Sequence, residues 1–291
     1  MFIAGIDGGG THTRLELRDM ENRVVRRAEF GPFNINSIGE NAFRNLLREV
    51  FAFCGGMENC VRLCVGAAGI SNPSVKQILA QELEQTGFRG KWKLCGDQEI
   101  ALRGAMDGPG VAVIAGTGSI CFGINAAGET ARSGGYGHLI DDGGSGYALG
   151  RDVFRCAVRS VDGRVNDTVI LREVCDRLGG GPEAIVPFVY APETDKSAIA
   201  KFSAIALEQA DRGNPEALRI LEQGARELAC LVEAAQKKLE LSGCRIALLG
   251  GLLEADNVYR RIVAERLACL GTVISPAHSP LWGAAQMAWE L

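Results

Sequence analysis

The chain has 291 residues and a formal net charge of −4, and 47% of its residues are hydrophobic while 23% are charged, which predicts a soluble globular protein of two domains or one large domain. This composition excludes extensive disorder, and a mildly acidic chain without a basic block argues against nonspecific binding to nucleic acid. The sequence has no long apolar span and no signal-like start, so we expect no membrane partner and a cytoplasmic location.

The first part of the chain alternates strand-like and helix-like segments. Apolar residues recur every three to four positions over residues 40–54, which is typical of a helix packed on a sheet. The expected strands are residues 1–6, 13–17, 24–30, 61–65 and 92–94. The expected helices are residues 40–54, residues 74–86 and a helix starting just after Asp97. This alternation indicates an α/β fold that opens with a β-meander.

A carboxylate and three glycines lie at the turn between the first two strands, which we call the first glycine turn (residues 8–13). Adjacent glycines allow positive φ and can direct several N–H groups at one anion, while Asp7 could hold a hydrated Mg²⁺ against that anion. A glycine-rich hairpin is the less favoured alternative, because three glycines exceed what a tight turn needs. The predicted phosphate-binding residues here are Gly8, Gly9, Gly10, Thr11 and Thr13.

The opening pattern recurs at residues 111–124, where an apolar strand runs into a Gly/Thr/Ser turn and then into another strand. We call this the second glycine turn (residues 116–119). Residues 107–110 form a natural linker before it. We therefore expect two similar domains, 1–108 and 109–278, which face each other across a ligand cleft, with a last helix over 279–291 packed on the first domain. The predicted phosphate-binding residues of this turn are Gly116, Thr117, Gly118 and Ser119.

The last third contains a predicted helix over 215–241, opened by Asn214 as N-cap and a proline, and a helix over 257–270. Between them, a buried strand over 245–249 ends in Gly250 and Gly251. Glycines directly after an apolar strand let a ligand approach the backbone, so we assign these two to the adenosine part of a nucleotide. Close packing between strand and helix is the alternative.

These turns, together with residues 134–150, occur in the order of the phosphate and adenosine motifs of the actin, sugar kinase and Hsp70 superfamily. Within it, the chain resembles the BadF/BadG/BcrA/BcrD-type ATPase family, in its N-acetylglucosamine kinase branch, from residue 3 to residue 285. The resemblance implies two ribonuclease-H-like, actin-like ATPase domains that flank a nucleotide and sugar cleft. It also implies ATP and Mg²⁺ as cofactors, an amino sugar as substrate, and a homodimer.

A base for the sugar hydroxyl is the main catalytic group that such a kinase needs, besides in-line positioning and charge neutralisation. Asp97 follows an apolar run and precedes a helical segment, so we expect it at a strand end beside a helix N-terminus. It also matches the position of the family's catalytic aspartate. A helix N-cap is the alternative role for this residue.

Sugar-binding candidates come from two segments. Asn34 matches the family's sugar-contacting asparagine, and Asn36 is a second carboxamide that could bind hydroxyls, with turn formation as the alternative. The resemblance assigns Asp142 to the sugar, and the ring of Tyr136 could stack on the face of the sugar. Gly135 is a further sugar-binding candidate. Asp141 and Gly143 depart from the family's usual Gly-Asp-Glu-Gly-Ser pattern, which leaves the substrate open. Either aspartate could instead cap the helix that starts near residue 147.

We therefore predict ATP-dependent phosphorylation of an amino sugar, with N-acetylglucosamine favoured over glucosamine and N-acetylmuramic acid. One alternative is an iron–sulfur ATPase that activates a 2-hydroxyacyl-CoA dehydratase type enzyme. The ten cysteines argue against it, because none forms Cys-X-X-Cys and most lie in apolar runs, as Cys121 does. The other alternative is a non-catalytic sugar sensor, which we disfavour because the chain begins directly at a strand, without a DNA-binding helix pair.

Overall fold

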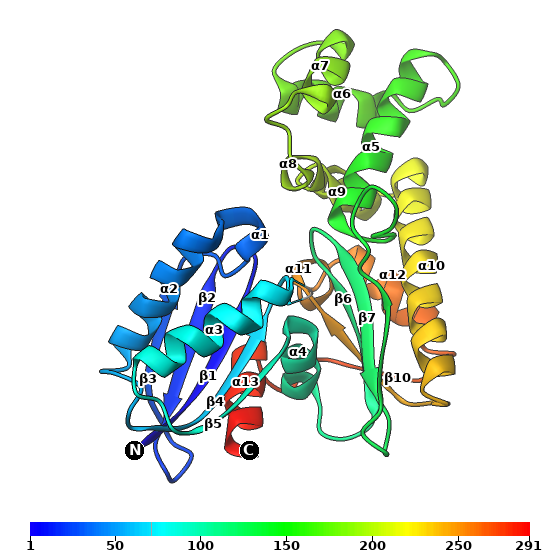
Figure 1. Ribbon diagram of the computed structural model, residues 1–291. Coiled ribbons are helices and arrows are strands. Elements are labelled where there is room, and N and C mark those ends of the chain that lie inside the picture. Colours follow the sequence, from blue (N-terminus) through cyan, green and yellow to red (C-terminus); the bar gives the residue numbers. More distant parts are fainter. Residues whose placement is uncertain (71) are drawn as a thin grey trace. The chain divides into compact units, whose positions relative to one another are not determined.

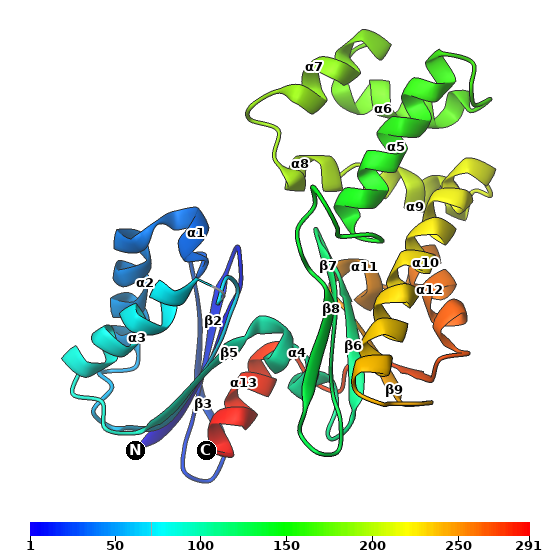
Figure 2. The ribbon, with the colours of Figure 1, turned by 45° about the vertical axis from the view of Figure 1, so that its right-hand side comes forward.

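The structure is a computed structural model that describes residues 1–70 and 72–291 (Figure 1 and, from a second side, Figure 2). The chain forms two compact units. Unit 1 consists of Met1–Asp107 and Pro276–Leu291, and unit 2 consists of Gly108–Ser275. Each unit contains one five-stranded sheet with helices packed on it, which confirms the predicted α/β fold class. Within the described residues, no helix combines the length and the apolar character needed to cross a bilayer.

The sheet of unit 1 has the strand order β3-β2-β1-β4-β5. The first three strands form the predicted antiparallel meander, and the other two are added in parallel. The strands are β1 (Phe2–Gly8), β2 (Thr13–Arg18), β3 (Val24–Phe30), β4 (Cys60–Ala67) and β5 (Lys91–Gly96). The helices are α1 (Ile35–Ile38), α2 (Glu40–Phe53), α3 (Pro73–Gln85), α4 (Asp97–Ala105) and α13 (Pro280–Trp289).

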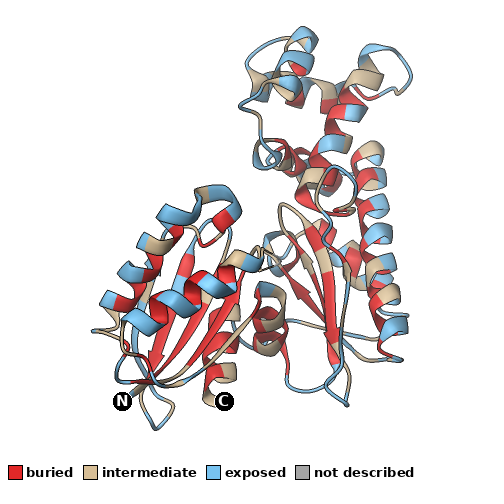
Figure 3. Ribbon diagram, viewed as in Figure 1, coloured by how far each residue is buried: buried red, intermediate tan, exposed pale blue. Residues whose placement is uncertain are grey.

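Helices cover both faces of this sheet, and the buried positions in Figure 3 follow that division. Phe43 of α2 and Leu79 of α3 are buried over one face, whereas Ile100 of α4 and Ala284 of α13 are buried over the other. Helix α13 lies very close to β1, since a Cβ at Gly5 would be 2.4 Å from the backbone nitrogen of Ala285. The end of the chain is therefore part of the core of unit 1.

Unit 2 repeats the topology of unit 1, with the order β10-β9-β6-β7-β8. Again three consecutive strands form an antiparallel meander and two later strands are added in parallel. The strands are β6 (Gly110–Ala115), β7 (Ser119–Ile124), β8 (Thr130–Gly134), β9 (Arg245–Leu249) and β10 (Thr272–Ile274). The helices are α5 (Gly146–Val161), α6 (Thr168–Leu178), α7 (Ile185–Tyr190), α8 (Lys196–Ala200), α9 (Ser203–Asp211), α10 (Pro215–Lys238), α11 (Gly251–Glu254) and α12 (Val258–Leu267), with a short 3₁₀ turn at Pro182–Ala184.

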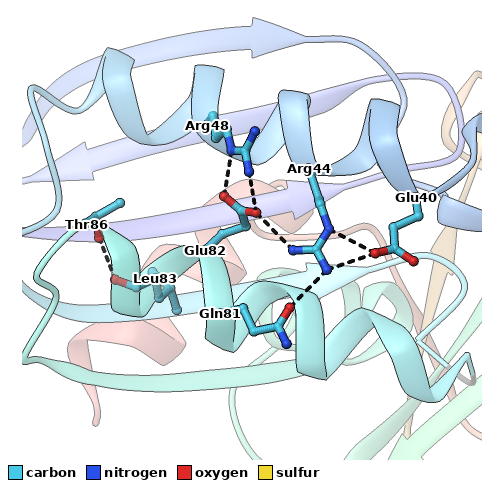
Figure 4. Close-up of polar contacts among 7 residues, drawn as sticks. All are labelled: Glu40, Arg44, Arg48, Gln81, Glu82, Leu83 and Thr86. Carbon is cyan, nitrogen blue, oxygen red and sulfur yellow. Dashed lines mark hydrogen bonds and ion pairs between the residues drawn. The ribbon is translucent and has the colours of Figure 1, made fainter.

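A buried carboxylate joins α2 to α3 in unit 1 (Figure 4). The Glu82 side chain is 2% exposed and accepts hydrogen bonds from Arg44 at 3.0 Å and from Arg48 at 2.8 and 3.0 Å. Arg44 also donates to Glu40 and to Gln81. Hydrogen bonding from Arg48, followed by that from Arg44, holds the pKa of Glu82 below its ordinary value. This network fixes the two helices that cover one face of the sheet.

Glu82→Gln is expected to lower the free energy of unfolding by about 1–3 kcal/mol at neutral pH, because two guanidinium groups lose a buried counter-charge. Since the folded pKa is lowered, this stabilisation is present above the ordinary pKa of 4.5 and is lost as the pH falls through the folded pKa. Denaturant unfolding at pH 7 and at acidic pH measures the difference. An equal loss at both pH values, or the same loss in the exposed control Glu84→Gln, would show that the charge is not the cause.

Candidate functional site

The first glycine turn connects β1 to β2, with Asp7 at the second-to-last position of β1. Across the antiparallel ladder, Asp7 pairs with Arg14, and the N–H of Gly9 donates to the carbonyl of His12 at 2.9 Å. Thr11 is exposed at the tip. This arrangement is a hairpin whose glycine backbone lies at the end of the sheet.

The predicted positive φ is wrong for this turn, since none of its three glycines has a positive φ. Space is the constraint instead: a Cβ at Gly8 would lie 2.5 Å from the Phe33 ring, and one at Gly9 would lie 3.0 Å from the His12 carbonyl. Nothing lies within 4 Å of a Cβ at Gly10. Close packing therefore explains why position 8 is a glycine, whereas the backbone at Gly10 is accessible at the tip of the turn.

Thr13 lies inside this turn rather than on its surface. The side chain is fully buried, and its hydroxyl donates to the carbonyl of Gly31 at 2.7 Å. This bond connects β2 to the segment that follows β3. The hydroxyl proton of Thr13 is therefore already used within the fold.

Asp7 and Asp97 lie at the carboxyl ends of β1 and β5, two parallel strands separated by β4. This end of a parallel sheet is where α/β proteins bind ligands. Burial raises the pKa of Asp7 to about 6; Arg14 opposes this shift, and the charge of Asp97 adds to it. Burial also raises the pKa of Asp97, although the N–H of Gln98 partly opposes it. The sheet thus places two carboxylates at the same end, and the charge of Asp97 raises the pKa of Asp7.

Asp97 is the first residue of α4, and Gly96 occupies the N-cap position. The alternative role of Asp97 as N-cap is therefore wrong. Its Oδ1 accepts the N–H of Gln98 at 3.0 Å, while the N–H of Gly96 donates to Glu99 at 3.1 Å. The helix N-terminus is thus stabilised by Glu99, and Asp97 is held at its first turn.

An asparagine cluster lies beside the end of β4. The Oδ1 of Asn34 caps α1 by accepting the N–H of Asn36 at 3.1 Å. The side chain of Asn36 in turn accepts the amide of Asn72 at 2.8 Å. Gly69 has a φ of +74°, and a Cβ there would lie 2.7 Å from Asn34 Oδ1. The predicted sugar-binding residues Asn34 and Asn36 are thus close together.

Asn72 is a member of this cluster that the sequence analysis missed. It caps α3 by accepting the N–H of Ser74 at 3.0 Å, and Pro73 follows it at the first helical position. The Asn-Pro pair that marks the start of the helix after Asn214 is present here too. That signal could have placed Asn72 at a helix start, but not beside Asn36.

In unit 2, the second glycine turn lies against Asp142. The buried Asp142 side chain is 5% exposed, and its Oδ1 accepts the N–H of Ser119 at 3.4 Å. A Cβ at Gly118 would be 3.0 Å from Asp142 Oδ2, and the Ser119 hydroxyl donates to the carbonyl of Gly143 at 2.8 Å. Asp142 has a φ of +60°, which is rare for a residue other than glycine and is typical of functional sites.

Ser145 is the N-cap of α5, so the capping alternative for Asp141 and Asp142 is wrong. Instead, Asp141 Oδ2 accepts the N–H of Tyr136 at 3.2 Å, which closes the loop between β8 and α5. The Tyr136 side chain is 64% exposed and lies against the guanidinium of Arg132 at 4.9 Å from its ring centroid. Gly135 has a φ of +76° at the start of this loop.

A pocket of about 390 Å³ in unit 2 brings the second glycine turn together with the turn after β9. Its lining includes Gly116, Thr117, Gly251 and Lys201, and its volume is within the usual range of about 300–1,000 Å³ for ligand pockets. Gly250 is explained by packing, because it has a φ of +88° and a Cβ there would lie 2.5 Å from a backbone oxygen of β6. Lys201 was not among the predicted site residues, because no helix or strand was predicted around α8.

Metal binding by side chains alone is not indicated in residues 1–70 and 72–291. No group of three or more His, Cys, Asp or Glu side chains in those ranges is arranged to hold a metal ion. Cys64 and Cys95 are neighbours on β4 and β5, with their sulfur atoms 3.9 Å apart, and both are buried. This contact, together with burial, raises the pKa of Cys95 well above its ordinary value.

Two named kinases are related to this chain over most of its length. The N-acetylmuramic acid/N-acetylglucosamine kinase of Clostridium acetobutylicum is 33% identical over 265 residues, which cover 88% of this chain and 87% of the relative. The N-acetyl-D-glucosamine kinase of Dictyostelium discoideum is 26% identical over 317 residues, which cover 99% of this chain and 97% of the relative.

The fold agrees with these relatives. The solved structure of a candidate N-acetylglucosamine kinase from Chromobacterium violaceum superimposes with a TM-score of 0.80 at 25% identity, and the match covers 99% of this chain and 98% of that chain. The sequence profile of the BadF/BadG/BcrA/BcrD ATPase family matches residues 4–288. The protein described here belongs to the BadF/BadG/BcrA/BcrD ATPase family.

Proposed function

We propose that this protein is an ATP-dependent sugar kinase that phosphorylates a hydroxyl of an amino sugar, with N-acetylglucosamine as the favoured substrate. The kinase class is supported by the two related kinases, which match this chain over nearly their full length. The observation that carries the proposal is the pair Asp7 and Asp97 at one end of a parallel sheet. A kinase needs a metal ligand and a base in such a place.

Asp97 is proposed as the general base. Its raised pKa favours proton acceptance from a sugar hydroxyl, because a carboxylate with a pKa closer to neutrality is a stronger base. The bond from Gln98 holds one carboxylate oxygen, which restricts the orientation of the group. In this role Asp97 receives the hydroxyl proton as the oxygen attacks the terminal phosphorus of ATP.

Asp7 is proposed to bind Mg²⁺. Mg²⁺ is usually held by one or two carboxylates together with water and phosphate oxygens, so a single half-buried carboxylate beside a glycine turn fits this ion. When bound, the ion supplies neutralisation of phosphate charge. The charge of Asp97 and the burial of Asp7 both disfavour an unpaired Asp7 carboxylate, and a cation would relieve both effects.

The glycine turns are proposed to bind phosphate oxygens through backbone N–H groups. In unit 1 the open positions for this role are Gly10 and Thr11, whereas the N–H of Gly9 already donates to the carbonyl of His12, and Gly8 and Thr13 contribute through packing and a side-chain bond. In unit 2 the second glycine turn is proposed to bind phosphate oxygens. The pocket that is lined by this turn and by Gly251 is proposed to bind the adenosine.

Asn34 and Asn36 are proposed as sugar ligands in unit 1, where each amide has hydrogen-bonding capacity beyond its capping or bridging bond. Asp142, Tyr136 and Gly135 are proposed for the sugar in unit 2. Asp142 also touches the second glycine turn, so it is placed to affect phosphate binding as well. A homodimer belongs to the same proposal and rests on the family resemblance, and a cytoplasmic location is proposed with it.

A coupled assay of ADP release tests the proposed function. The protein is mixed with ATP and Mg²⁺ and with N-acetylglucosamine, glucosamine, N-acetylmuramic acid or glucose in turn. ADP release that depends on an amino sugar supports the kinase. Hydrolysis of ATP that no sugar changes favours the dehydratase activator, and sugar binding without any turnover favours the sensor.

Asp142→Asn is expected to fold normally and to lose about 10- to 100-fold in kcat/KM for the sugar. Asparagine tolerates the left-handed backbone at this position, so the change removes the negative charge without adding strain. Circular dichroism and steady-state kinetics measure the two effects. The matched control is Asp141→Asn, in which the amide oxygen can still accept the N–H of Tyr136. Equal kinetics for both variants would contradict a specific role for Asp142.

A further inference from the structure

A second pocket, of about 640 Å³, lies in unit 1 where the start of α3 meets the edge strand β5. Its walls are mainly apolar and come from Ile70, Pro73, Trp92 and Leu94. Asn72 adds an amide, and Lys76 and Lys93 each add an ammonium group. None of the roles proposed above uses this pocket.

The pocket carries an unpaired positive charge. Within the part of the chain that the structure describes, Lys76 has no hydrogen bond or ion pair, whereas the neighbouring Lys93 lies 3.7 Å from Glu99. Lys76 is in the first turns of α3, and the first turn of this 13-residue helix contains no acidic residue. The ammonium group and the helix N-terminus therefore both favour an anionic group at this place.

The pocket also adjoins the asparagine cluster of Asn34, Asn36 and Asn72. Asn72 lines the pocket, and its amide donates to Asn36 at 2.8 Å. Leu94, on another wall, precedes Asp97 by three residues, which corresponds to about 10 Å along a strand. If Asn36 binds the sugar and one sugar hydroxyl lies near Asp97, another substituent of the same sugar ring would point toward this pocket.

We propose that the pocket receives the lactyl ether group of N-acetylmuramic acid and that Lys76 binds its carboxylate. This inference rests on the proposed function and names a second substrate for the same site. The lactyl group consists of a methyl group and a carboxylate on one short ether, which matches apolar walls with one lysine, Lys76, that has no carboxylate partner among the described residues, beside a second, Lys93, that is paired with Glu99. N-acetylglucosamine has only a hydroxyl at that position, so it does not reach Lys76.

The test compares two sugars and three variants in the ADP-release assay. Lys76→Met removes the charge and keeps the length of the side chain, Lys76→Arg restores a cation, and Lys237→Met is the control at an exposed lysine on α10. We expect Lys76→Met to lower kcat/KM for N-acetylmuramic acid at least about 10-fold, mainly through KM, and to leave N-acetylglucosamine unchanged. Lys76→Arg restores part of the loss, and Lys237→Met changes neither sugar.

A neutral analogue isolates the charge. The carboxamide of N-acetylmuramic acid has nearly the same shape as the acid, so its kcat/KM is expected to be the same in the wild type and in Lys76→Met. The lactyl pocket is overturned if Lys76→Met loses kcat/KM equally for both sugars. It is also overturned if the wild type phosphorylates N-acetylglucosamine but not N-acetylmuramic acid. Either result leaves the kinase proposal intact. Activity on neither sugar overturns both. Unchanged thermal melting of Lys76→Met confirms that a loss is not due to unfolding.

Discussion

Asp97→Asn is expected to lower kcat by at least about 10²-fold while the fold stays intact. The amide cannot take the proton from the sugar hydroxyl, but its oxygen can still accept the N–H of Gln98, so the start of α4 is preserved. Steady-state ADP release at saturating sugar and ATP measures the loss. Asp107→Asn, at an exposed carboxylate just after the other end of α4, is the matched control and keeps the wild-type kcat.

The pH dependence of kcat tests the proposed role of Asp97 independently. The base must be ionised, so kcat of the wild type falls as the pH falls through the raised pKa of Asp97. In Asp97→Asn the residual activity has no such acid limb. A variant that keeps a near-normal kcat, or one that keeps the wild-type acid limb, would rule out Asp97 as the base.

Asp7→Asn is expected to stabilise the ligand-free protein at alkaline pH and to weaken its response to Mg²⁺. Burial raises the folded pKa of Asp7 from 3.8 to about 6, so between these values the folded state binds more protons than the unfolded state. Stability therefore falls as the pH rises through this window, by at most about 3 kcal/mol at 1.36 kcal/mol per pKa unit. Asparagine carries no charge, so Asp7→Asn avoids the loss of folding stability that comes from ionising Asp7 in the folded state.

Thermal melts of wild type and Asp7→Asn at pH 4 and pH 8 measure the stability difference, which should be present at pH 8 and absent at pH 4. A Mg²⁺ titration of the ADP-release assay measures the second effect, for which we expect at least a roughly 10-fold weaker apparent affinity. A variant that is less stable at pH 8, or one with the Mg²⁺ response of the wild type, would contradict the proposed role of Asp7.

The larger part of the fold could be predicted from the sequence because apolar periodicity and turn residues agree there. The helix predicted over 40–54 is observed as Glu40–Phe53, and the one over 74–86 as Pro73–Gln85. Strand β10 has only three residues, too few to show a period, and it was missed. The segment from α6 to α9 was missed as well, although Asp167 caps α6 in the usual way.

The candidate site was less predictable, because its residues meet through contacts that are distant in sequence. Gly8 needs no positive φ, and only the Phe33 ring against it explains the absence of a side chain. Asp142 contacts Ser119, which lies 23 residues earlier, and no local pattern indicates this. Spacing alone likewise does not reveal that Asn72 bridges Asn36 to the pocket with Lys76.

Under the proposed function, this protein transfers a phosphoryl group from ATP to an amino sugar. The most direct test incubates the protein with ATP, Mg²⁺ and N-acetylglucosamine and quantifies both products, ADP by the coupled assay and the sugar phosphate by ³¹P NMR. We expect equal amounts of ADP and sugar phosphate, and at least about 100-fold less of both products from Asp97→Asn over the same time. ADP formed without a sugar phosphate would contradict it.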